Sequence, residues 1–338
     1  MKTLQVLKGR EFAIRDLPIP QPGPGEALLR VEAVTTCPQW DLHLRHNEPM
    51  FVGHRFEYPY TPGQPGHEAT GTVAALGEGV TDLAVGDRVS AWRDAGQNRP
   101  GCYAQYVVHT EENLIRVPTH LPPEATAPVE LAMCVASTFL LLKEMNAVRG
   151  KRFGVMGLGP AGLIAVQMAR AEGAEAVIGF DFHPSRRALA LALGAEAAYD
   201  PRDDLSQRFP TRLQARPTLD CALDCVGAKA SVEYLMDRTA DVVALFGVQR
   251  ENYTFAPHHY GGLRLCGYRG HSRAAAEYAV GLMEQGKLSL APLVTHHLPL
   301  ERYAEGIDLL ERQEAIKICF WPWKETLRGR EDDADASL

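Results

Sequence analysis

The chain has 338 residues, of which 46% are hydrophobic and 23% charged, and its formal net charge is −7. This length predicts two domains, and the composition is that of an ordinary globular protein. The negative charge is spread along the chain, which argues against a nucleic acid or an anionic membrane surface as partner, because such partners select a basic patch or stripe.

Residues 1 to about 145 have a β-rich pattern. Clusters of Gly and Pro separate short β-like runs at 27–34, 70–76, 88–92 and 104–109. A helix is predicted over 129–145, at the end of this first domain.

From residue 146 the pattern changes to strands that alternate with helices. Strands are predicted at 152–157, 176–181, 219–224, 241–247 and 263–267, and helices at 161–173 and 184–194. This alternation predicts βαβ units and a parallel sheet, so the fold class is α/β with a doubly wound domain at 146–289. The β-like runs that resume at residue 290 are expected to rejoin the first domain. The residues from about 324 to 338 are expected to form a flexible tail.

A glycine-rich segment follows the first strand of the second domain. Its sequence is Gly157-Leu158-Gly159-Pro160-Ala161-Gly162, which has GxGxxG spacing between a predicted strand and a predicted helix. Glycines at these places allow a tight turn, a close approach to a pyrophosphate and close packing of helix on strand. The segment therefore predicts a dinucleotide site.

An acidic residue at the end of the next strand indicates which dinucleotide. Asp181 follows Gly162 at the distance where a carboxylate accepts hydrogen bonds from the ribose hydroxyls of NAD and repels a 2′-phosphate. Arg186 and Arg187 leave NADP open as the alternative, but as solvated charges at a helix start they have a simpler explanation. NAD is the predicted coenzyme.

Seven cysteines at irregular spacing, without a signal peptide, argue against a disulfide framework and favour a cytoplasmic location. No run approaches the ~20 apolar residues of a membrane helix, so no membrane partner is expected.

The string Gly66-His67-Glu68, with Cys37 upstream and the dinucleotide segment downstream, resembles the zinc-containing medium-chain dehydrogenase/reductase family of alcohol and polyol dehydrogenases. The run at 18–26, the segments 70–89 and 101–108, and the end from 286 to 320 extend this resemblance over nearly the whole chain. It implies a GroES-like catalytic domain interrupted by a Rossmann domain, with hydride transfer between an alcohol or its carbonyl and NAD.

The resemblance also implies a catalytic zinc, for which Cys37 and His67 match the first two ligands and Glu68 the neighbouring carboxylate. When the family pattern is matched forward from residue 113, Glu130 takes the position of the third zinc ligand. When it is matched backward from Gly150, Cys134 takes that position. Both stay open, with Glu130 preferred. The loop after Val89 has one cysteine, Cys102, where many relatives carry four, so one zinc per subunit and no structural zinc are expected.

The proton relay departs from the family pattern. Cys37 and Asp41 are separated by one residue more than is usual in the family. The Ser or Thr that usually precedes the Asp is absent here, and Thr36 is the candidate to supply a hydroxyl in its place. Asp41 still resembles the carboxylate that orients the histidine ligand, and His43 resembles the relay histidine. Lys317 resembles a basic residue that reaches the coenzyme pyrophosphate, or is a surface lysine.

The substrate is expected to be a small alcohol or carbonyl compound, bound near Trp40, the segment 51–60 and Trp92. By resemblance, the chain forms homodimers or homotetramers through the sheet edge near 263–267. The alternatives are a zinc-free NADPH-dependent quinone or enoyl reductase on the same fold, and a nucleotide-binding protein without catalysis.

Overall fold

The computed structural model describes residues 1–51 and 53–324, and the chain divides into two compact units. Unit 1 comprises Met1–Pro128 and the chain from Val294, and unit 2 comprises Val129–Leu293. The tail predicted at about 324–338 lies, apart from Lys324, outside the described residues. Helix α3 (Val129–Glu144) belongs to unit 2, although the sequence analysis placed it in the first domain. The helix is buried on most sides and packs against α4 (Pro160–Ala171) and α7 (Arg273–Glu284) of unit 2, which explains the difference.

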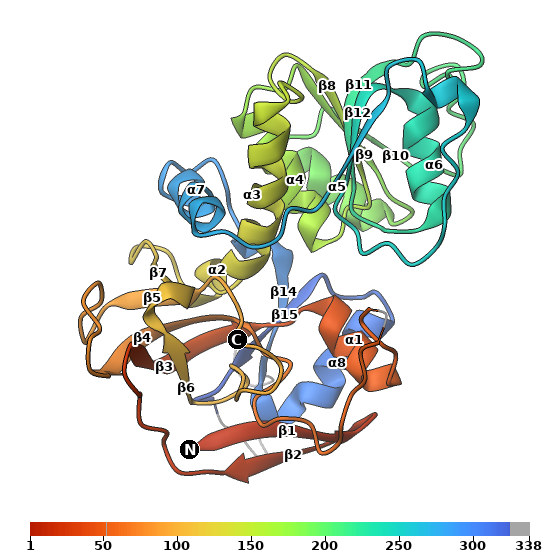
Figure 1. Cartoon of the computed structure of the whole chain (residues 1–338). Coiled ribbons are helices and arrows are strands. Elements are labelled where there is room, and N and C mark those ends of the chain that lie inside the picture. Colours follow the sequence, from red (N-terminus) through yellow and green to blue (C-terminus); the bar gives the residue numbers. More distant parts are fainter. Residues whose placement is uncertain (52, 325–338) are drawn as a thin grey trace, which may run out of the picture. The chain divides into compact units, whose positions relative to one another are not determined.

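Unit 1 is built on a seven-stranded mixed sheet, with an antiparallel hairpin beside it (Figure 1). The sheet order is β14-β15-β3-β4-β5-β7, and β6 pairs with β3. Two helices, α1 and α8, pack against each other in this unit. The elements of unit 1 are β1 (Lys2–Lys8), β2 (Glu11–Asp16), β3 (Glu26–Thr35), α1 (Pro38–His46), β4 (Glu68–Leu76), β5 (Arg88–Ala91), β6 (Tyr106–Thr110), β7 (Leu114–Arg116), α2 (Pro123–Thr126), β14 (Val294–Pro299), α8 (Tyr303–Glu311) and β15 (Lys317–Trp321).

Strand β3 is the centre of unit 1 and brings distant segments together. It pairs antiparallel with β4, so that Thr35 lies opposite Glu68, and antiparallel with β15, so that Thr35 also lies opposite Cys319. The end of β3, the start of β4 and the start of β15 therefore meet at one place. Cys37 follows β3 directly, and this junction carries the candidate site.

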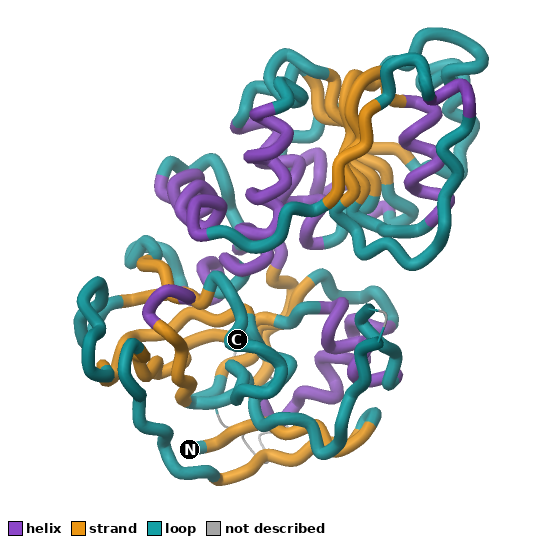
Figure 2. The backbone as a smooth tube through the Cα atoms, in the orientation of Figure 1, coloured by secondary structure: helices purple, strands orange, loops and turns teal. Residues whose placement is uncertain are grey.

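Unit 2 contains a six-stranded parallel sheet in the order β10-β9-β8-β11-β12-β13, with helices on both faces (Figure 2). Strand order reverses at β8, and the carboxyl end of such a strand is where doubly wound sheets bind dinucleotides. The Rossmann prediction is confirmed. The remaining elements are β8 (Arg152–Met156), β9 (Ala176–Phe180), α5 (Pro184–Ala192), β10 (Ala197–Tyr199), β11 (Leu219–Asp224), α6 (Lys229–Arg238), β12 (Thr239–Leu245) and β13 (Arg264–Gly267).

One helical run, Pro123–Glu144, has the length and the apolar composition of a membrane span, contrary to the expectation that no run of the sequence approaches them. Of its most apolar window, 78% is buried within the protein. Core helices of globular proteins have these same properties, so the run is explained by packing.

Candidate functional site

Cys37 lies at the junction between β3 and α1. It occupies the N-cap position of α1 in an extended conformation, and Pro38 begins the helix. Proline suits the first helical position because its missing N–H would have no partner there. The backbone of Thr36 is tied to β15 by a hydrogen bond to the Ile318 carbonyl, which fixes where the thiol leaves the chain.

His67 immediately precedes β4 and is 7% exposed. Its ring nitrogen Nδ1 lies 2.8 Å from the carbonyl oxygen of Pro65. A carbonyl only accepts, so Nδ1 carries the proton and Nε2 has the lone pair that a metal needs.

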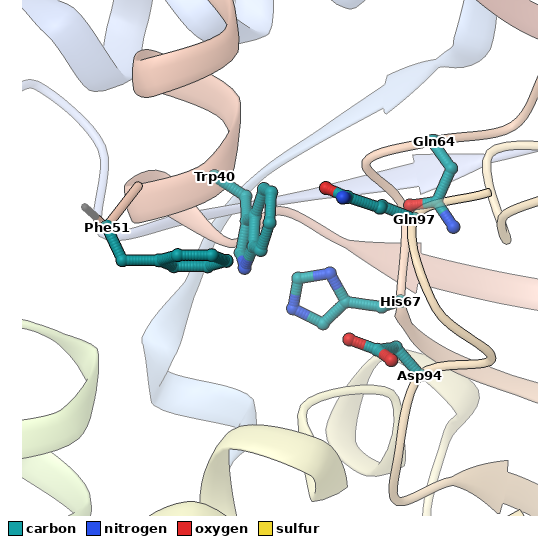
Figure 3. A pocket seen from close by; sticks show the side chains of 6 residues that line it. All are labelled: Trp40, Phe51, Gln64, His67, Asp94 and Gln97. Atoms are coloured by element: carbon teal, nitrogen blue, oxygen red, sulfur yellow. The ribbon is translucent and has the colours of Figure 1, made fainter. Parts of the chain in front are cut away.

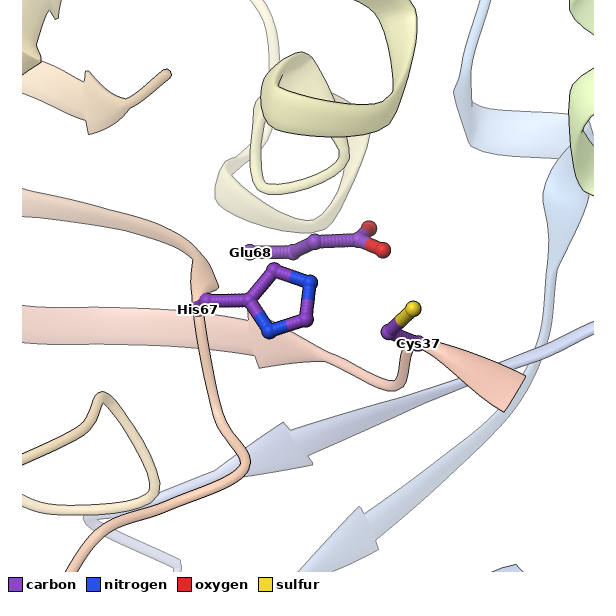
Figure 4. Close-up of side chains that lie close together, drawn as sticks. All are labelled: Cys37, His67 and Glu68. Atoms are coloured by element: carbon purple, nitrogen blue, oxygen red, sulfur yellow. The ribbon is translucent and has the colours of Figure 1, made fainter. Parts of the chain in front are cut away.

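Cys37, His67 and Glu68 each place one ligand atom within 4.8 Å of the other two (Figure 4). Thiolate, imidazole and carboxylate are the donors that zinc prefers in proteins. These residues therefore fit a zinc ion, and the structure brings together the two predicted ligands and the predicted neighbouring carboxylate.

Glu68 is held by a buried ion pair that the sequence analysis did not predict. Lys317 Nζ lies 2.5 Å from Glu68 Oε2 and 2.6 Å from the Thr36 carbonyl oxygen. The Thr35 hydroxyl also donates to Glu68, at 3.0 Å. Lys317 is fully buried, and its ammonium group is engaged beside the candidate metal ligands, while its predicted role at the coenzyme pyrophosphate stays a prediction.

Asp41 lies in α1 and is fully buried. Its carboxylate accepts hydrogen bonds from the hydroxyls of Tyr103 and Tyr303, each at 2.9 Å. Burial raises the pKa of Asp41 to about 6, against the opposing effect of the two tyrosine hydrogen bonds. His67 Nδ1 also contacts the Pro65 carbonyl oxygen, and the role of Asp41 in orienting this histidine stays a prediction.

The two predicted relay groups have different surroundings. His43 Nδ1 lies 3.0 Å from the Glu48 carbonyl oxygen, which leaves Nε2 for proton exchange. The Thr36 hydroxyl is buried and accepts a hydrogen bond from the Ile318 N–H at 3.0 Å, inside the sheet junction. His43 therefore fits the relay role better than Thr36 does.

A pocket of about 270 Å³ opens beside His67 (Figure 3). The rings of Trp40 and Phe51 lie on one side of it, as predicted, and polar side chains lie on the other. Trp92, also predicted, is buried instead, and its Nε1–H donates to the Glu112 carbonyl. The sequence analysis missed the polar lining residues, which are Gln64, Asp94 and Gln97.

The two alternatives for the third zinc ligand lie side by side in unit 2, one helical turn apart on α3. The Cys134 thiol donates to Glu130 Oε1 at 3.4 Å, and His271 Nε2 lies 3.2 Å from the same oxygen. The three residues form a second group of potential metal ligands within 4.8 Å of one another. His271 joins this group from a loop before α7 that carries no sequence signal of its own.

The glycine-rich segment has the predicted strand–turn–helix geometry between β8 and α4. Gly157 has φ +84°, which L side chains rarely adopt, and its N–H donates to the Phe180 carbonyl of β9. Gly159 is the N-cap of α4, and Pro160 and Ala161 begin the helix. A Cβ on Gly162 would lie 1.8 Å from the Gly157 carbonyl oxygen, so only glycine allows this approach of helix and strand.

Asp181 follows β9 and is joined to the same loop. Its Oδ2 accepts the Leu158 N–H and its Oδ1 the His183 N–H, both at 2.7 Å. Arg187 donates to the Asp181 backbone carbonyl and to Asp200, so it is engaged in local structure. These contacts place the Asp181 carboxylate beside the dinucleotide loop.

A third group of potential ligands, Asp237 with His258 and His259, is explained by hydrogen bonding. His259 Nδ1 accepts the Ala256 N–H at 3.0 Å, so its Nε2 carries the proton and donates to Asp237 at 2.8 Å. A metal at Nε2 would require a proton on Nδ1, where the Ala256 N–H already points. The group is therefore a hydrogen-bonded cluster.

Comparisons with known proteins agree with both units. The model of the alcohol dehydrogenase GroES-like domain matches residues 23–119, and that of zinc-binding dehydrogenases matches residues 160–285. Sorbitol dehydrogenase of Gallus gallus is 28% identical over 93% of this chain and 94% of its own. L-threonine 3-dehydrogenase of Thermococcus kodakarensis is 27% identical over 91% and 94%. The crystal structure of an NAD-dependent alcohol dehydrogenase is 26% identical with a TM-score of 0.81, and the match covers 95% and 99% of the two chains.

The fold and the site define a nicotinamide-dependent oxidoreductase. The chain belongs to the zinc-type medium-chain alcohol and polyol dehydrogenase family. The predicted family and function class are confirmed.

Proposed function

We propose that this protein is a dehydrogenase with one catalytic zinc that transfers hydride between a small alcohol or polyol and NAD. The observation that carries the proposal is the group of Cys37, His67 and Glu68, whose ligand atoms converge beside a pocket for a small molecule. Zinc would acidify the bound substrate hydroxyl, and the nicotinamide would accept the hydride from its carbon.

We assign Cys37, His67 and Glu130 as the three zinc ligands. The assignment of Glu130 rests on the family resemblance; within unit 2 its carboxylate accepts from the Cys134 thiol and lies 3.2 Å from His271 Nε2. Cys134 remains the alternative ligand on the same helix face. A single zinc is supported by the loop at 90–106, where the thiol of Cys102 lies against His109.

The chain's own residues would support the reaction in distinct ways. The Pro65 carbonyl keeps the proton on His67 Nδ1, which directs Nε2 to the metal. Lys317 and Thr35 fix the position of the Glu68 carboxylate beside the other ligands. Trp40 and Phe51 form the apolar side of the pocket, on which the carbon chain of a substrate would pack. His43, with Nδ1 fixed on Glu48, would exchange a proton with solvent at Nε2.

We infer NAD rather than NADP as the coenzyme because Asp181 lies at the end of β9, next to the loop formed by Gly157, Gly159 and Gly162. A carboxylate there accepts from ribose hydroxyls and repels a 2′-phosphate. By analogy with the family, we propose a homodimer or homotetramer that forms through strand β13, at the edge of the parallel sheet. A cytoplasmic location is supported by seven cysteines that are all free thiols.

The test is metal analysis of the purified protein together with NADH formation from a panel of alcohols and polyols. About one zinc per chain, with turnover that chelation abolishes, would support the proposal. Cys37→Ala is expected to lose the zinc and nearly all turnover but keep NADH binding in unit 2. Cys221→Ala, which removes the thiol of another cysteine, in β11 of unit 2, is the control and should change neither zinc content nor turnover. Metal-replete protein that holds no zinc, but reduces enones or quinones with NADPH, would establish the zinc-free reductase instead.

A further inference from the structure

The pocket beside His67 has an unequal distribution of charge. Its described lining residues include one carboxylate, Asp94, and no Lys or Arg (Figure 3). Apart from the zinc proposed at His67, no described lining residue carries a positive charge that would offset the repulsion between Asp94 and a negatively charged group on a substrate. The remaining polar groups are two amides, Gln64 and Gln97, whose orientations follow from their partners.

A chain of three hydrogen bonds fixes the orientation of Gln97. The Met50 N–H points to Nδ1 of His54 at 3.2 Å, so Nδ1 is the acceptor and Nε2 carries the proton. That Nε2–H donates to Gln97 Oε1 at 2.7 Å. The oxygen of the amide is thereby engaged, and its NH₂ group is the part that Gln97 offers to the pocket as a donor. Figure 3 shows this amide extending toward Trp40.

Gln64 and Asp94 provide the opposite chemistry. The Gln64 NH₂ donates to the carbonyl oxygens of Gly96 and Arg99, at 3.3 and 2.9 Å, which leaves its Oε1 as an acceptor. Asp94 Oδ1 accepts the Gly96 N–H at 2.9 Å, and Oδ2 is the second carboxylate oxygen. The pocket thus presents a donor and two acceptors, one of them charged, opposite the aromatic rings.

A hydroxyl group donates and accepts at once, whereas carboxylate and phosphate groups only accept. Resting on the proposed function, we propose that Asp94 and Gln97 determine substrate specificity: they bind a second, uncharged hydroxyl of the substrate and reject analogues that carry an anionic group there. The hydroxyl donates to Asp94 and accepts from Gln97, while its carbon chain packs on Trp40 and Phe51.

Matched substrates test the proposal in the zinc-loaded enzyme. Propane-1,2-diol and lactate differ by a CH₂OH group in place of a carboxylate, and propan-2-ol lacks the second polar group. Sorbitol and sorbitol 6-phosphate form a larger pair. The kcat/KM for each uncharged member is expected to exceed that of its anionic partner by about 100-fold. An anionic group cannot donate a hydrogen bond to Asp94, so the acceptors of the pocket would stay unpaired when the anionic substrate is bound.

Asp94→Asn keeps the shape of the side chain and removes its charge. It is expected to lower the ratio of kcat/KM for uncharged over anionic substrates by about 10-fold or more, with little change for propan-2-ol. Gln97→Leu should lower kcat/KM for the diol relative to propan-2-ol. Asp82→Asn, the same change at an exposed position, is the control and should leave every ratio as it was.

The outcomes separate the two proposals. Turnover of the whole series with equal kcat/KM for both members of each pair, or an unchanged ratio in Asp94→Asn, would overturn the specificity assignment and leave the dehydrogenase function standing. A zinc-loaded, NAD-binding protein that oxidises no member of the series, propan-2-ol included, would overturn both.

Discussion

Lys317 and Glu68 form an ion pair whose side chains are 0% and 1% exposed, with 2.5 Å between Nζ and Oε2. The two residues lie at the starts of β15 and β4, strands that both pair with β3. Each charge of a buried ion pair compensates the other, so removal of one partner leaves an uncompensated buried charge and destabilises the folded protein. The pair therefore ties the late segment of the chain to the metal-ligand segment.

Lys317→Met is expected to lower the free energy of unfolding by about 3–5 kcal/mol, because Glu68 would remain buried without its cation. Urea denaturation measures this loss. The double variant Lys317→Met with Glu68→Leu should recover much of it, which separates the pair from a general packing defect. If Lys317 acted on the coenzyme pyrophosphate instead, the single variant would weaken NADH binding and leave stability nearly unchanged.

Asp181→Gly is expected to weaken NADH binding more than NADPH binding, because the carboxylate that accepts from the ribose and repels a 2′-phosphate is gone. The Leu158 N–H also loses its partner, but that loss affects both coenzymes alike, so the ratio of the two dissociation constants isolates the ribose contact. Fluorescence titration with both coenzymes measures the ratio. An unchanged ratio would remove Asp181 from coenzyme selection; Asp203→Asn, at an exposed position, serves as control.

His109 makes the protein sensitive to acid. Burial lowers its pKa from 6.5 to about 4, so the folded protein keeps it neutral while the unfolded chain takes up a proton near pH 6.5. Between these values the unfolded state takes up the His109 proton first, so the contribution of His109 to stability falls as pH drops, by up to about 3 kcal/mol, while the raised pKa of Asp41 acts in the opposite direction. His109→Leu should remove this contribution, so that between pH 6.5 and 4 its unfolding free energy falls less, or rises more, than that of the unmodified protein. His120→Leu, at an exposed histidine, should keep the full slope; a parallel slope in both variants would contradict the assignment.

Gly162→Ala is expected to weaken NADH binding about 10-fold or more, because the new Cβ would displace either the loop backbone or the start of α4. Gly281→Ala is the matched control. Gly281 lies in α7, its added Cβ would meet nothing within 4 Å, and alanine there should raise stability by about 1 kcal/mol. Coenzyme titration and thermal unfolding of both variants make the comparison; equal NADH affinity in both would contradict the packing argument.

Much of unit 2 could be predicted from local sequence, since its strands and helices are marked at both ends. Gly173 and Gly194, with φ of +80° and +107°, are the last residues of the predicted helices 161–173 and 184–194, and glycine is the residue that most readily adopts this backbone conformation at a helix end. The glycine-rich loop likewise has a fixed local geometry. Such features depend on neighbours within a few residues, so the sequence contains what determines them.

The contacts of the site depend on which strands pair and in which register, and local sequence patterns do not indicate this pairing. Nothing near Lys317 indicates Glu68, 249 positions away, because their meeting requires the register of β3 with both partners. The tyrosines on Asp41 and the amides of the pocket were missed for the same reason. Helix α1 was also missed: it begins with a proline, Pro38, its residues have no strong apolar period, and its packing on α8 stabilises it.

The segment at 63–67, which ends in His67, is joined to the loop at 96–103 by backbone contact. Gly101 and Tyr103 donate their N–H groups to Pro62 and Gly63, and a Cβ on Gly63 would lie 2.2 Å from the Gly101 oxygen. Gln64 adds two hydrogen bonds to the same loop. The proposed metal ligand His67 and the polar side of the pocket therefore belong to one hydrogen-bonded unit, and we expect a change in either of them to alter the other.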